Sequence, residues 1–480
     1  MKSLFLCLAL AAPLPAATLR SLGAKGDGVT DDRAAIETAL KESAGQPLDG
    51  EGLTYAVDGN VSAAVPVDLS NLTLKQTAGT FDTSPYIQSI HSKEKPKVTP
   101  PAALTRMVNG LPYMRADGRA TYPEDPVITG DAKQALRKML NIRTLFISGT
   151  EGKPVPVKLH HVHILRGDHA DAGMHSNAAG LYLVNASPLE LNDVEITGDG
   201  KGAGLQVNNC HHIRIHKLNI HDIRWAPFQG DPQFTGEVEG RDFGWNNSPI
   251  YDYDDRQGRF IRVRVQEQLS GFFLAQCDDV EITDSRIERI GTTMDGKFLP
   301  WQADGMTVNA VKNLVIRDCV VNEVWEGIDF TGGGVDGFVE ENIRMKDCFS
   351  YSFKYAHPQK NGKVINCVSE GASYKGFTIG SECDTIEFIN CVALETGKAG
   401  YWRREGRPKN GIAGFDVHFD PDHSPRNITL KDCRAENRRY PTMEFGFLTN
   451  ERSKKAEFNI QLIHPKVSGA SIKDVEGFAP

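Results

Sequence analysis

The chain has 480 residues, with 54 basic and 62 acidic side chains and a formal net charge of −8. Charged residues make up 24% and hydrophobic residues 40% of the chain, a globular composition that excludes a wholly disordered protein. The acidic balance argues against nucleic acid as the partner, because nucleic-acid binders present a basic surface to the phosphates.

The first 17 residues have the pattern of a secretory signal peptide. Met1 and Lys2 give a short positive start, the stretch from Ser3 to Ala12 is almost wholly apolar, and small residues before Thr18 suit cleavage. The segment is too short to span a membrane, and no later run approaches 18 apolar residues. We therefore expect a secreted or periplasmic protein that makes no membrane contact. Residues 18–480 are predicted to form its single domain.

A glycine-rich turn at residues 23–28 precedes a predicted helix. Thr30 or Asp31 can cap this helix. Its apolar side is predicted to consist of Ala34, Ala35, Ile36, Ala39 and Leu40. The turn lacks the Lys-Ser/Thr ending of a phosphate-binding loop. A helix here suits the first coil of a solenoid, which otherwise exposes an apolar end and open strand edges.

A repeat of 22 to 25 residues runs through most of the chain. Each copy has a small residue followed by an apolar, a variable and an apolar residue. The copies begin at Gly180, Gly204, Gly271, Gly305, Gly327, Ser352, Gly376 and Gly414, with a weaker copy at Gly446. Two or three short strands in each repeat of this length predict an all-β fold, the parallel β-helix.

Eight cysteines lie beyond the signal segment, and five of them follow Asn or Asp at the end of a strand-like run. These five are Cys319, Cys348, Cys367, Cys391 and Cys433. An exported protein can form disulfides. The recurring position nevertheless favours a stacked column of free thiols in the core.

The stretch from Gly23 to Leu40 resembles the opening segment of pectate-lyase-like right-handed β-helix proteins. That superfamily includes polysaccharide lyases, family 28 glycoside hydrolases and phage tailspike depolymerases. Together with the repeats, the resemblance extends over most of the mature chain. It implies a right-handed solenoid with an N-terminal capping helix and a carbohydrate substrate, but it does not specify the reaction.

Three segments interrupt the repeat. Residues 81–145 are rich in proline, with a predicted helix from Ala132 to Leu140; residues 223–268 are aromatic and acidic, and residues 397–412 are basic. Long insertions in compact domains are commonly functional loops, and on solenoids they tend to gather on one binding face.

Strand alternation predicts which side chains leave the core. In each copy, the residues one and three positions after the aligned glycine are apolar and should point inward, so the residue between them should point outward. This predicted outer column is Tyr182, Gln206, Phe273, Thr307, Asp329, Lys354, Thr378 and Asp416. Because neighbouring coils lie about 4.8 Å apart, we expect one patch of catalytic side chains. Its members are Asp304, Glu326, Asp329 and Lys354.

Aromatic, basic and polar residues flank this patch. Those that we expect to bind substrate are Trp301, Trp325, His357, Arg403, Arg404, Asp416 and His418. Indole rings can stack on sugar rings, and basic side chains can pair with anionic groups. The combination predicts an acidic polysaccharide as the substrate.

The first reaction that fits is β-elimination on a glycan that contains uronic acid. A cation or an arginine would neutralise the uronate, and Lys354 would remove the C5 proton as the base. Asp304, Glu326 and Asp329 offer the hard oxygen ligands that Ca²⁺ prefers. Three nearby carboxylates should raise the pKa of Lys354, so a lyase of this kind should depend on the cation or on the loop arginines.

The second reaction is hydrolysis with inversion, which the resemblance to family 28 hydrolases implies. Asp304 and Glu326 would then act as acid and base around a water molecule. The chain departs from that family, because Trp325 replaces one carboxylate of its paired aspartates and Tyr351 stands at its Gly-His-Gly. A third possibility is a non-catalytic glycan-binding solenoid or a uronan epimerase that uses the same surface.

Overall fold

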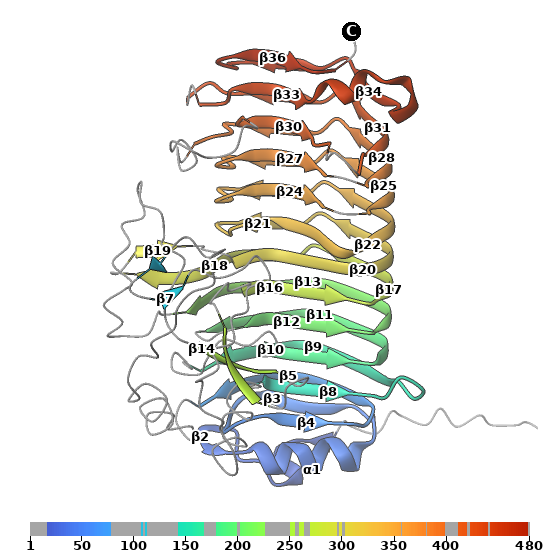
Figure 1. Cartoon of the computed structure of the whole chain (residues 1–480). Helices are drawn as coiled ribbons and strands as arrows, with labels where there is room; N and C mark the ends of the chain where they lie inside the picture. The colour runs from blue at the N-terminus through green and yellow to red at the C-terminus, as the bar shows by residue number, and fades with distance from the viewer. Residues whose placement is uncertain are drawn as a thin grey trace, which may run out of the picture.

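Short strands and sharp corners alternate along the chain, and the strands of successive coils lie side by side. Figure 1 shows the computed structural model as a stack of coils that rises from helix α1 (Arg33–Ser43) at one end to strand β36 (Lys473–Glu476) at the other. Among the described residues, thirty-two strands belong to one hydrogen-bonded network, which pairs in parallel except at β19 (Lys297–Leu299). This architecture is a parallel β-helix, so the predicted fold class is confirmed.

The structure describes most of the coils and a few short strands outside them. The described residues are 17–77, 143–167, 179–198, 202–225, 269–294, 297–299, 303–356, 358–380, 382–398, 411–419, 423–439 and 442–478, with strands at 107–108, 111–112, 250–254 and 259–263. The predicted signal peptide lies outside them except for Ala17, as do the predicted helix at 132–140 and most of the three predicted insertions. Strand β8 already begins at Arg143 and strand β13 ends at Trp225, so two insertion boundaries shift by three residues.

Three sheets form the walls of the solenoid. The first contains the predicted outer column; its strands are β4 (Val61–Ala63), β8 (Arg143–Ser148), β10 (Ala179–Val184), β12 (Ala203–Asn208), β16 (Leu269–Ala275), the first parts of β20 (Ala303–Arg317) and β22 (Ile328–Glu341), β24 (Tyr351–Tyr355), β27 (Lys375–Ile379), β30 (Ala413–Val417), β33 (Phe445–Thr449) and β36. The second contains parts of β3 (Leu48–Val57), β5 (Val67–Gln76), β9 (Val155–Arg166), β11 (Ala186–Gly198) and β13 (His211–Trp225), then β17 (Asp278–Thr283), the later parts of β20 and β22, β25 (Lys360–Ile365), β28 (Asp384–Ile389), β31 (Arg426–Lys431) and β34 (Ile460–Ile463).

The third sheet continues the long early strands around a corner. Its later strands are β18 (Arg286–Met294), β21 (Val320–Asn322), β23 (Arg344–Lys346), β26 (Val368–Glu370), β29 (Val392–Leu394), β32 (Arg434–Glu436) and β35 (Lys466–Ser468). The elements not yet named are β1 (Ala17–Thr18), η1 (Arg20–Leu22), β2 (Asp27–Asp31), β6 (Met107–Val108), β7 (Leu111–Pro112), β14 (Ile250–Asp254), β15 (Arg259–Val263), η2 (Glu451–Lys454) and η3 (Ala456–Phe458).

The coils turn at residues with a left-handed backbone. All eight described cysteines directly follow such a residue; Asp318, for example, has φ 54° and precedes Cys319. Asn and Asp adopt this conformation more readily than most residues, which explains the Asn/Asp-Cys pattern. The eight described cysteines are buried and free, as predicted. Strand register places Cys319, Cys367, Cys391 and Cys433 at one corner, with Ile343 between the first two, whereas Cys348 follows β23 at the next corner and lies outside the predicted column.

The aligned glycines are required by close contact between coils. A Cβ added to Gly204 would lie 2.7 Å from the carbonyl oxygen of Gly271 and 2.7 Å from Cγ2 of the buried Ile220. The same contact with the glycine carbonyl of the next coil recurs at Gly271 and Gly305. A side chain there would therefore push neighbouring coils apart.

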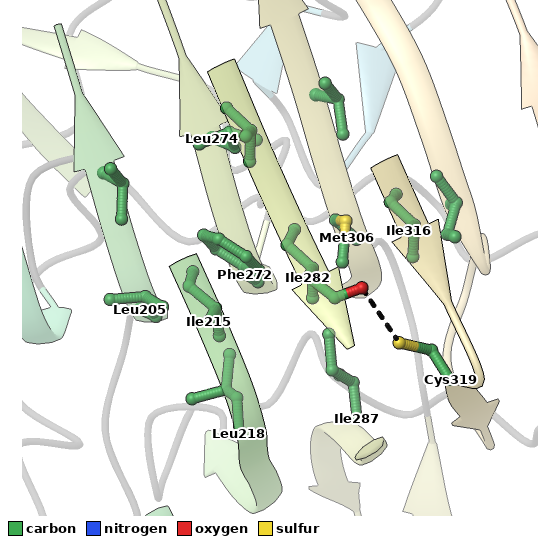
Figure 2. Close-up of a cluster of buried hydrophobic side chains, with 14 of the residues drawn as sticks. Leu205, Ile215, Leu218, Phe272, Leu274, Ile282, Ile287, Met306, Ile316 and Cys319 are labelled. Atoms are coloured by element: carbon green, nitrogen blue, oxygen red, sulfur yellow. Dashed lines mark hydrogen bonds between the residues drawn. The ribbon is translucent and has the colours of Figure 1, made fainter. Parts of the chain in front are cut away.

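Apolar side chains stack along the inside of the solenoid. Four phenylalanine rings from successive coils, Phe353, Phe377, Phe415 and Phe447, have centroids 4.5, 4.6 and 4.8 Å apart. Figure 2 shows the same layering in earlier coils, where Leu205, Phe272 and Met306 face Ile215 and Ile282. Cys319 belongs to this core, and its Sγ lies 3.9 Å from the Ile282 carbonyl oxygen. Stacked aromatic pairs contribute about 0.5–1.5 kcal/mol beyond area burial.

Helix α1 covers the first coil, as predicted. Its fully buried side chains are Ile36, Ala39 and Leu40. Asp32, rather than Thr30 or Asp31, directly precedes the first helical residue. The Asp31 carboxylate nevertheless accepts a hydrogen bond from the backbone N–H of Arg33 at 3.1 Å. The Asp32 carboxylate instead accepts hydrogen bonds from the backbone N–H groups of Lys25 and Gly26 at 2.6 and 2.9 Å, and so closes the glycine-rich turn. Among the described residues, no helix is long and apolar enough to cross a membrane.

Candidate active site

Strand pairing places the residues of the predicted outer column side by side along the first sheet. Thr307 pairs with Asp329, Asp329 with Lys354, and Lys354 with Thr378. Tyr182 and Gln206 pair in the same way farther toward the N-terminus. The sequence therefore predicts the order of these side chains correctly. Most of them are nevertheless almost inaccessible to solvent, a feature that alternation alone does not predict.

Three carboxyl groups meet on this face across consecutive coils. One oxygen from each of Asp304, Glu326 and Asp329 lies within 4.8 Å of the other two. We call these three residues the carboxylate cluster. All three are buried.

Lys354 forms ion pairs with two members of the carboxylate cluster. Its Nζ lies 2.7 Å from Glu326 Oε2 and 3.2 Å from Asp329 Oδ2. Burial alone would lower the pKa of Lys354, but the charges of Glu326 and Asp329 raise it well above its ordinary value. Lys354 is therefore fully protonated in this arrangement, which disfavours it as a base unless another positive charge displaces it.

Burial raises the pKa values of two carboxyl groups in the cluster, those of Asp304 and Glu326. It raises the pKa of Asp304 well above its ordinary value, and the charges of Glu326 and Asp329 add to this effect. Burial also raises the pKa of Glu326, to about 7, although Lys354 opposes the shift. Asp304 therefore tends to keep its proton, while Glu326 gains or loses one near neutrality.

One oxygen of the carboxylate cluster has no hydrogen-bond partner. Asp329 Oδ1 is buried and unpaired, whereas Oδ2 contacts Lys354. Leaving a buried polar atom unpaired costs about 1–3 kcal/mol, and more for a charged group. A proton, a metal ion or a substrate hydroxyl would relieve that cost. Three carboxylates also form a donor set that fits a hard cation such as Ca²⁺.

Two hydroxyl groups support Asp304. Thr307 Oγ1 donates to Asp304 Oδ2 at 3.2 Å, and Ser270 Oγ lies 3.2 Å from Thr307 Oγ1. Ser270 Oγ itself donates to the carbonyl oxygen of Phe272 at 2.9 Å. Ser270 is absent from the predicted site, although it occupies the position before the aligned glycine and pairs in register with Asp304.

A second buried ion pair lies on the next coils. Lys375 Nζ contacts Asp416 Oδ2, and Thr378 Oγ1 donates to the same oxygen at 3.2 Å. Both charged side chains are only 4% exposed. Asp416, which the sequence predicts to bind substrate, is thus already neutralised by Lys375. Lys375 directly precedes the aligned Gly376, the position that Asp304 and Glu326 occupy in earlier coils.

Trp325 does not form the exposed sugar platform that the sequence predicts. Its side chain is buried, and its ring stacks on Phe349 with the centroids 6.3 Å apart. His418 follows β30 and is half-buried, and its backbone N–H donates to Ile379 O at 2.7 Å. The other predicted substrate-binding residues, Trp301, His357, Arg403 and Arg404, lie outside the described residues.

The outer column becomes aromatic toward the N-terminus. Tyr182 packs with Phe146 and Phe273 in a small apolar cluster that is separate from the main core. The Arg143 guanidinium lies 4.4 Å from the ring centre of Phe146 and 4.2 Å from that of Tyr182. Phe146 and Arg143 are absent from the predicted site, because they precede Gly180, the first glycine of the repeat pattern.

Comparison with known families agrees with this architecture. The family described as "right handed beta helix region" matches residues 173–342 and 253–417, which together span 245 of the 480 residues. Residues 24–62 match the family described as the N-terminal extension of bacteriophage endosialidase. No curated protein matches the sequence.

Several solved structures resemble the chain at low sequence identity. A tailspike protein of E. coli bacteriophage HK620 is 8% identical with a TM-score of 0.45, and the alignment covers 97% of this chain but only 63% of the tailspike. The A-module of the Azotobacter vinelandii mannuronan C-5 epimerase AlgE4 is 12% identical with a TM-score of 0.32, covering 96% of this chain and 98% of that module. An alginate lyase from Paenibacillus sp. str. FPU-7 is 10% identical with a TM-score of 0.38, covering 93% and 97%. These likenesses concern the fold alone. With more than half of its length matched by that family, the chain belongs to the right-handed β-helix proteins.

Proposed function

We propose that the chain is a polysaccharide hydrolase whose reaction takes place at the carboxylate cluster. The observation that carries this proposal is the pairing of a carboxyl group that tends to keep its proton, Asp304, with one that titrates near neutrality, Glu326. Cleavage of a glycosidic bond needs both a proton donor and an ionised carboxylate. A long polymer suits the outer face, since the outer column continues from coil to coil.

Asp304 and Glu326 have complementary roles in this proposal. Asp304 gives its proton to the glycosidic oxygen as the bond between that oxygen and the anomeric carbon breaks. Glu326, ionised, faces the positive charge that develops at the anomeric carbon. Lys354 favours the ionised form of Glu326 through its contact at 2.7 Å.

The spacing of the carboxyl groups favours retention of configuration. The nearest oxygens of the cluster lie within 4.8 Å of one another. Retaining glycosidases separate their two carboxyl groups by about 5–5.5 Å and inverting ones by about 6.5–9.5 Å, to leave room for water. We therefore propose that Glu326 attacks the anomeric carbon and that water then releases the product. We propose retention in place of the inversion that the family 28 resemblance implies.

A cation-dependent lyase is the second candidate, and the unpaired Asp329 Oδ1 favours it. Asp304, Glu326 and Asp329 would hold Ca²⁺, which supplies positive charge to a uronate carboxylate when it is bound. Lys354, released from its two ion pairs and neutral after giving its proton to water, would then take the C5 proton, while the C4–O bond breaks and the leaving oxygen gains a proton from water. The preference for an acidic polysaccharide in either reaction depends on Arg403 and Arg404 in the basic insertion.

A polysaccharide panel tests both candidates. The purified protein is incubated with neutral and uronate-containing polysaccharides, with Ca²⁺ or with a chelator. New reducing ends without ultraviolet absorbance from an unsaturated product are the expected result. Unsaturated product that requires Ca²⁺ would replace the hydrolase with the lyase. Binding without cleavage of any polymer would leave the glycan-binding solenoid and the uronan epimerase.

Two variants connect the reaction to the cluster. Asp304→Asn cannot donate a proton and should lose nearly all activity while it keeps the fold. Glu387→Gln changes a half-exposed carboxylate on the second sheet and should keep full activity. Equal activity in the two variants would remove Asp304 from the mechanism.

We also propose that the protein acts outside the cytoplasm, because residues 1–17 have the signal-peptide pattern. Mass spectrometry of the protein exported by its native host would locate the mature N-terminus. A retained, uncleaved N-terminus would contradict export by this route.

A further inference from the structure

A glutamate lies inside the apolar core of the solenoid. Glu340 belongs to the later part of β22, where it pairs with Ile316 on one side and Val364 on the other. Both neighbours are fully buried core residues, and Glu340 itself is 0% exposed. The strand thus places a carboxyl group in a column that other coils fill with apolar side chains.

Glu340 has one side-chain hydrogen-bond partner among the described residues. The hydroxyl group of Tyr355 donates to Glu340 Oε2, and Glu340 Oε1 is buried without a partner. The Tyr355 ring is packed on several sides by Phe330, Phe338 and Phe388, at centroid distances of 5.4, 5.8 and 5.4 Å. None of these contacts brings an opposite charge to the Glu340 carboxyl group.

The titratable groups that face this pair are thiols. Cys367 Sγ lies 3.7 Å from the Glu340 carbonyl oxygen, and Cys391 Sγ lies 3.3 Å from that of Val364. Both thiols contribute to the raised pKa of Tyr355, and neither contributes to the raised pKa of the Glu340 carboxyl group. The described part of the chain contains no ion pair to Glu340. An ionised carboxylate here would be an uncompensated buried charge, which proteins avoid by holding a proton.

We propose that Glu340 carries a proton in the folded protein at neutral pH and that alkaline loss of this proton loosens the central coils. Burial raises the pKa of Glu340 to about 8, although the Tyr355 hydrogen bond opposes this effect. In the unfolded chain, the same group titrates near its ordinary value of about 4.3. The folded state therefore holds a proton that the unfolded state releases across this interval.

The sign of the pH dependence follows from that difference. The stability contributed by the bound proton is fully present below the unfolded pKa and is lost as the pH rises through the folded pKa. Between these limits, each pH unit raises the unfolding equilibrium constant up to tenfold through this one group.

The interior pair is connected to the candidate active site through β24. Tyr355 directly follows Lys354 in this strand, and successive side chains of a strand point to opposite faces. A shift of Tyr355 inside the core therefore also displaces Lys354 outside it. This consequence for activity rests on the proposed function, whereas the stability effect does not.

Thermal unfolding of the full chain tests the proposal without any substrate. Wild type and Glu340→Gln are compared from about pH 5 to about pH 9. The amide keeps an acceptor for Tyr355 but does not titrate, so Glu340→Gln should gain stability relative to wild type as the pH rises. A difference in melting temperature that is constant across the pH range would overturn the proposal.

A matched control and a direct measurement complete the test. Glu341→Gln changes the neighbouring carboxylate, which is 32% exposed and pairs with Arg317 at 3.0 Å. This variant should not gain thermal stability relative to wild type as the pH rises. Infrared spectra of wild type at neutral pH should contain the band of a protonated carboxyl group that Glu340→Gln lacks. If Glu340→Gln does not fold, the Glu340→Leu/Tyr355→Phe double variant takes its place. Identical infrared spectra for wild type and the folded variant would refute the buried proton.

Discussion

Lys354 determines the electrostatics of the candidate active site. It is the cation that contacts both Glu326 and Asp329, and its side chain is 26% exposed. Its ammonium group lies where a metal ion would bind the same carboxylates, so the two cations should compete. This single residue links the protonation of the cluster to any metal affinity.

Lys354→Met should move the acid limb of the pH profile to higher pH. In wild type we expect kcat/KM to rise through about pH 7 as Glu326 loses its proton. Removing the ammonium group destabilises the ionised form of Glu326 and raises its pKa further. Measuring kcat/KM against pH for both proteins checks this shift. Lys363→Met, at an exposed position on the second sheet, is the control; an unmoved limb in Lys354→Met would count against the role of Glu326.

The same substitution should create measurable Ca²⁺ affinity. The carboxylate cluster would then keep its three oxygen ligands but lose the internal cation that competes for them. Calorimetric titration of Lys354→Met with Ca²⁺ should detect binding, whereas wild type should bind more weakly. Equal binding by the two proteins would show that Lys354 and the metal ion do not compete.

At the scale of single elements, the repeat predicts strand positions well and surface exposure poorly. The aligned glycines locate β10, β12, β16, β27 and β30, because each glycine marks a contact between coils. Alternation then gives the outward residues and their pairing. It cannot give the burial of Trp325, which depends on packing against Phe349. It also misses Glu340, because a lone interior carboxyl group breaks the pattern on which the prediction depends.

A glycine of the repeat should be far less replaceable than a glycine outside it. Gly204→Ala places a Cβ 2.7 Å from the Gly271 carbonyl oxygen, so the coils must separate locally. Such overpacking costs about 1–3 kcal/mol. Gly152→Ala is the matched control, since nothing lies within 4 Å of the added Cβ. Thermal unfolding should show a loss for the first variant alone, and similar melting temperatures would contradict the steric account.

At the scale of the whole molecule, the solenoid is a sum of coils that contact only their neighbours. Most of the apolar core, from Leu19 near the first coil to Phe478 near the last, forms one continuous cluster. The period of the repeat is enough to predict this architecture. The site requires more, because the sequence segments that contain Trp301, His357 and the two arginines do not follow the repeat.

Alkylation of the buried cysteines can show which coils of the solenoid unfold first. Burial raises the pKa of Cys210 to about 11 and that of Cys319 to about 12, so neither should react with alkylating reagents in the folded state. After denaturation without a reductant, mass spectrometry should find all eight described cysteines alkylated, because all are free. Fewer labels would indicate disulfides and contradict the prediction of free thiols.

Partial denaturation should label Cys433, near the C-terminal end, before Cys319 in the middle, since terminal coils have a neighbour on one side only. Simultaneous labelling of both would show instead that the stack opens as one cooperative unit.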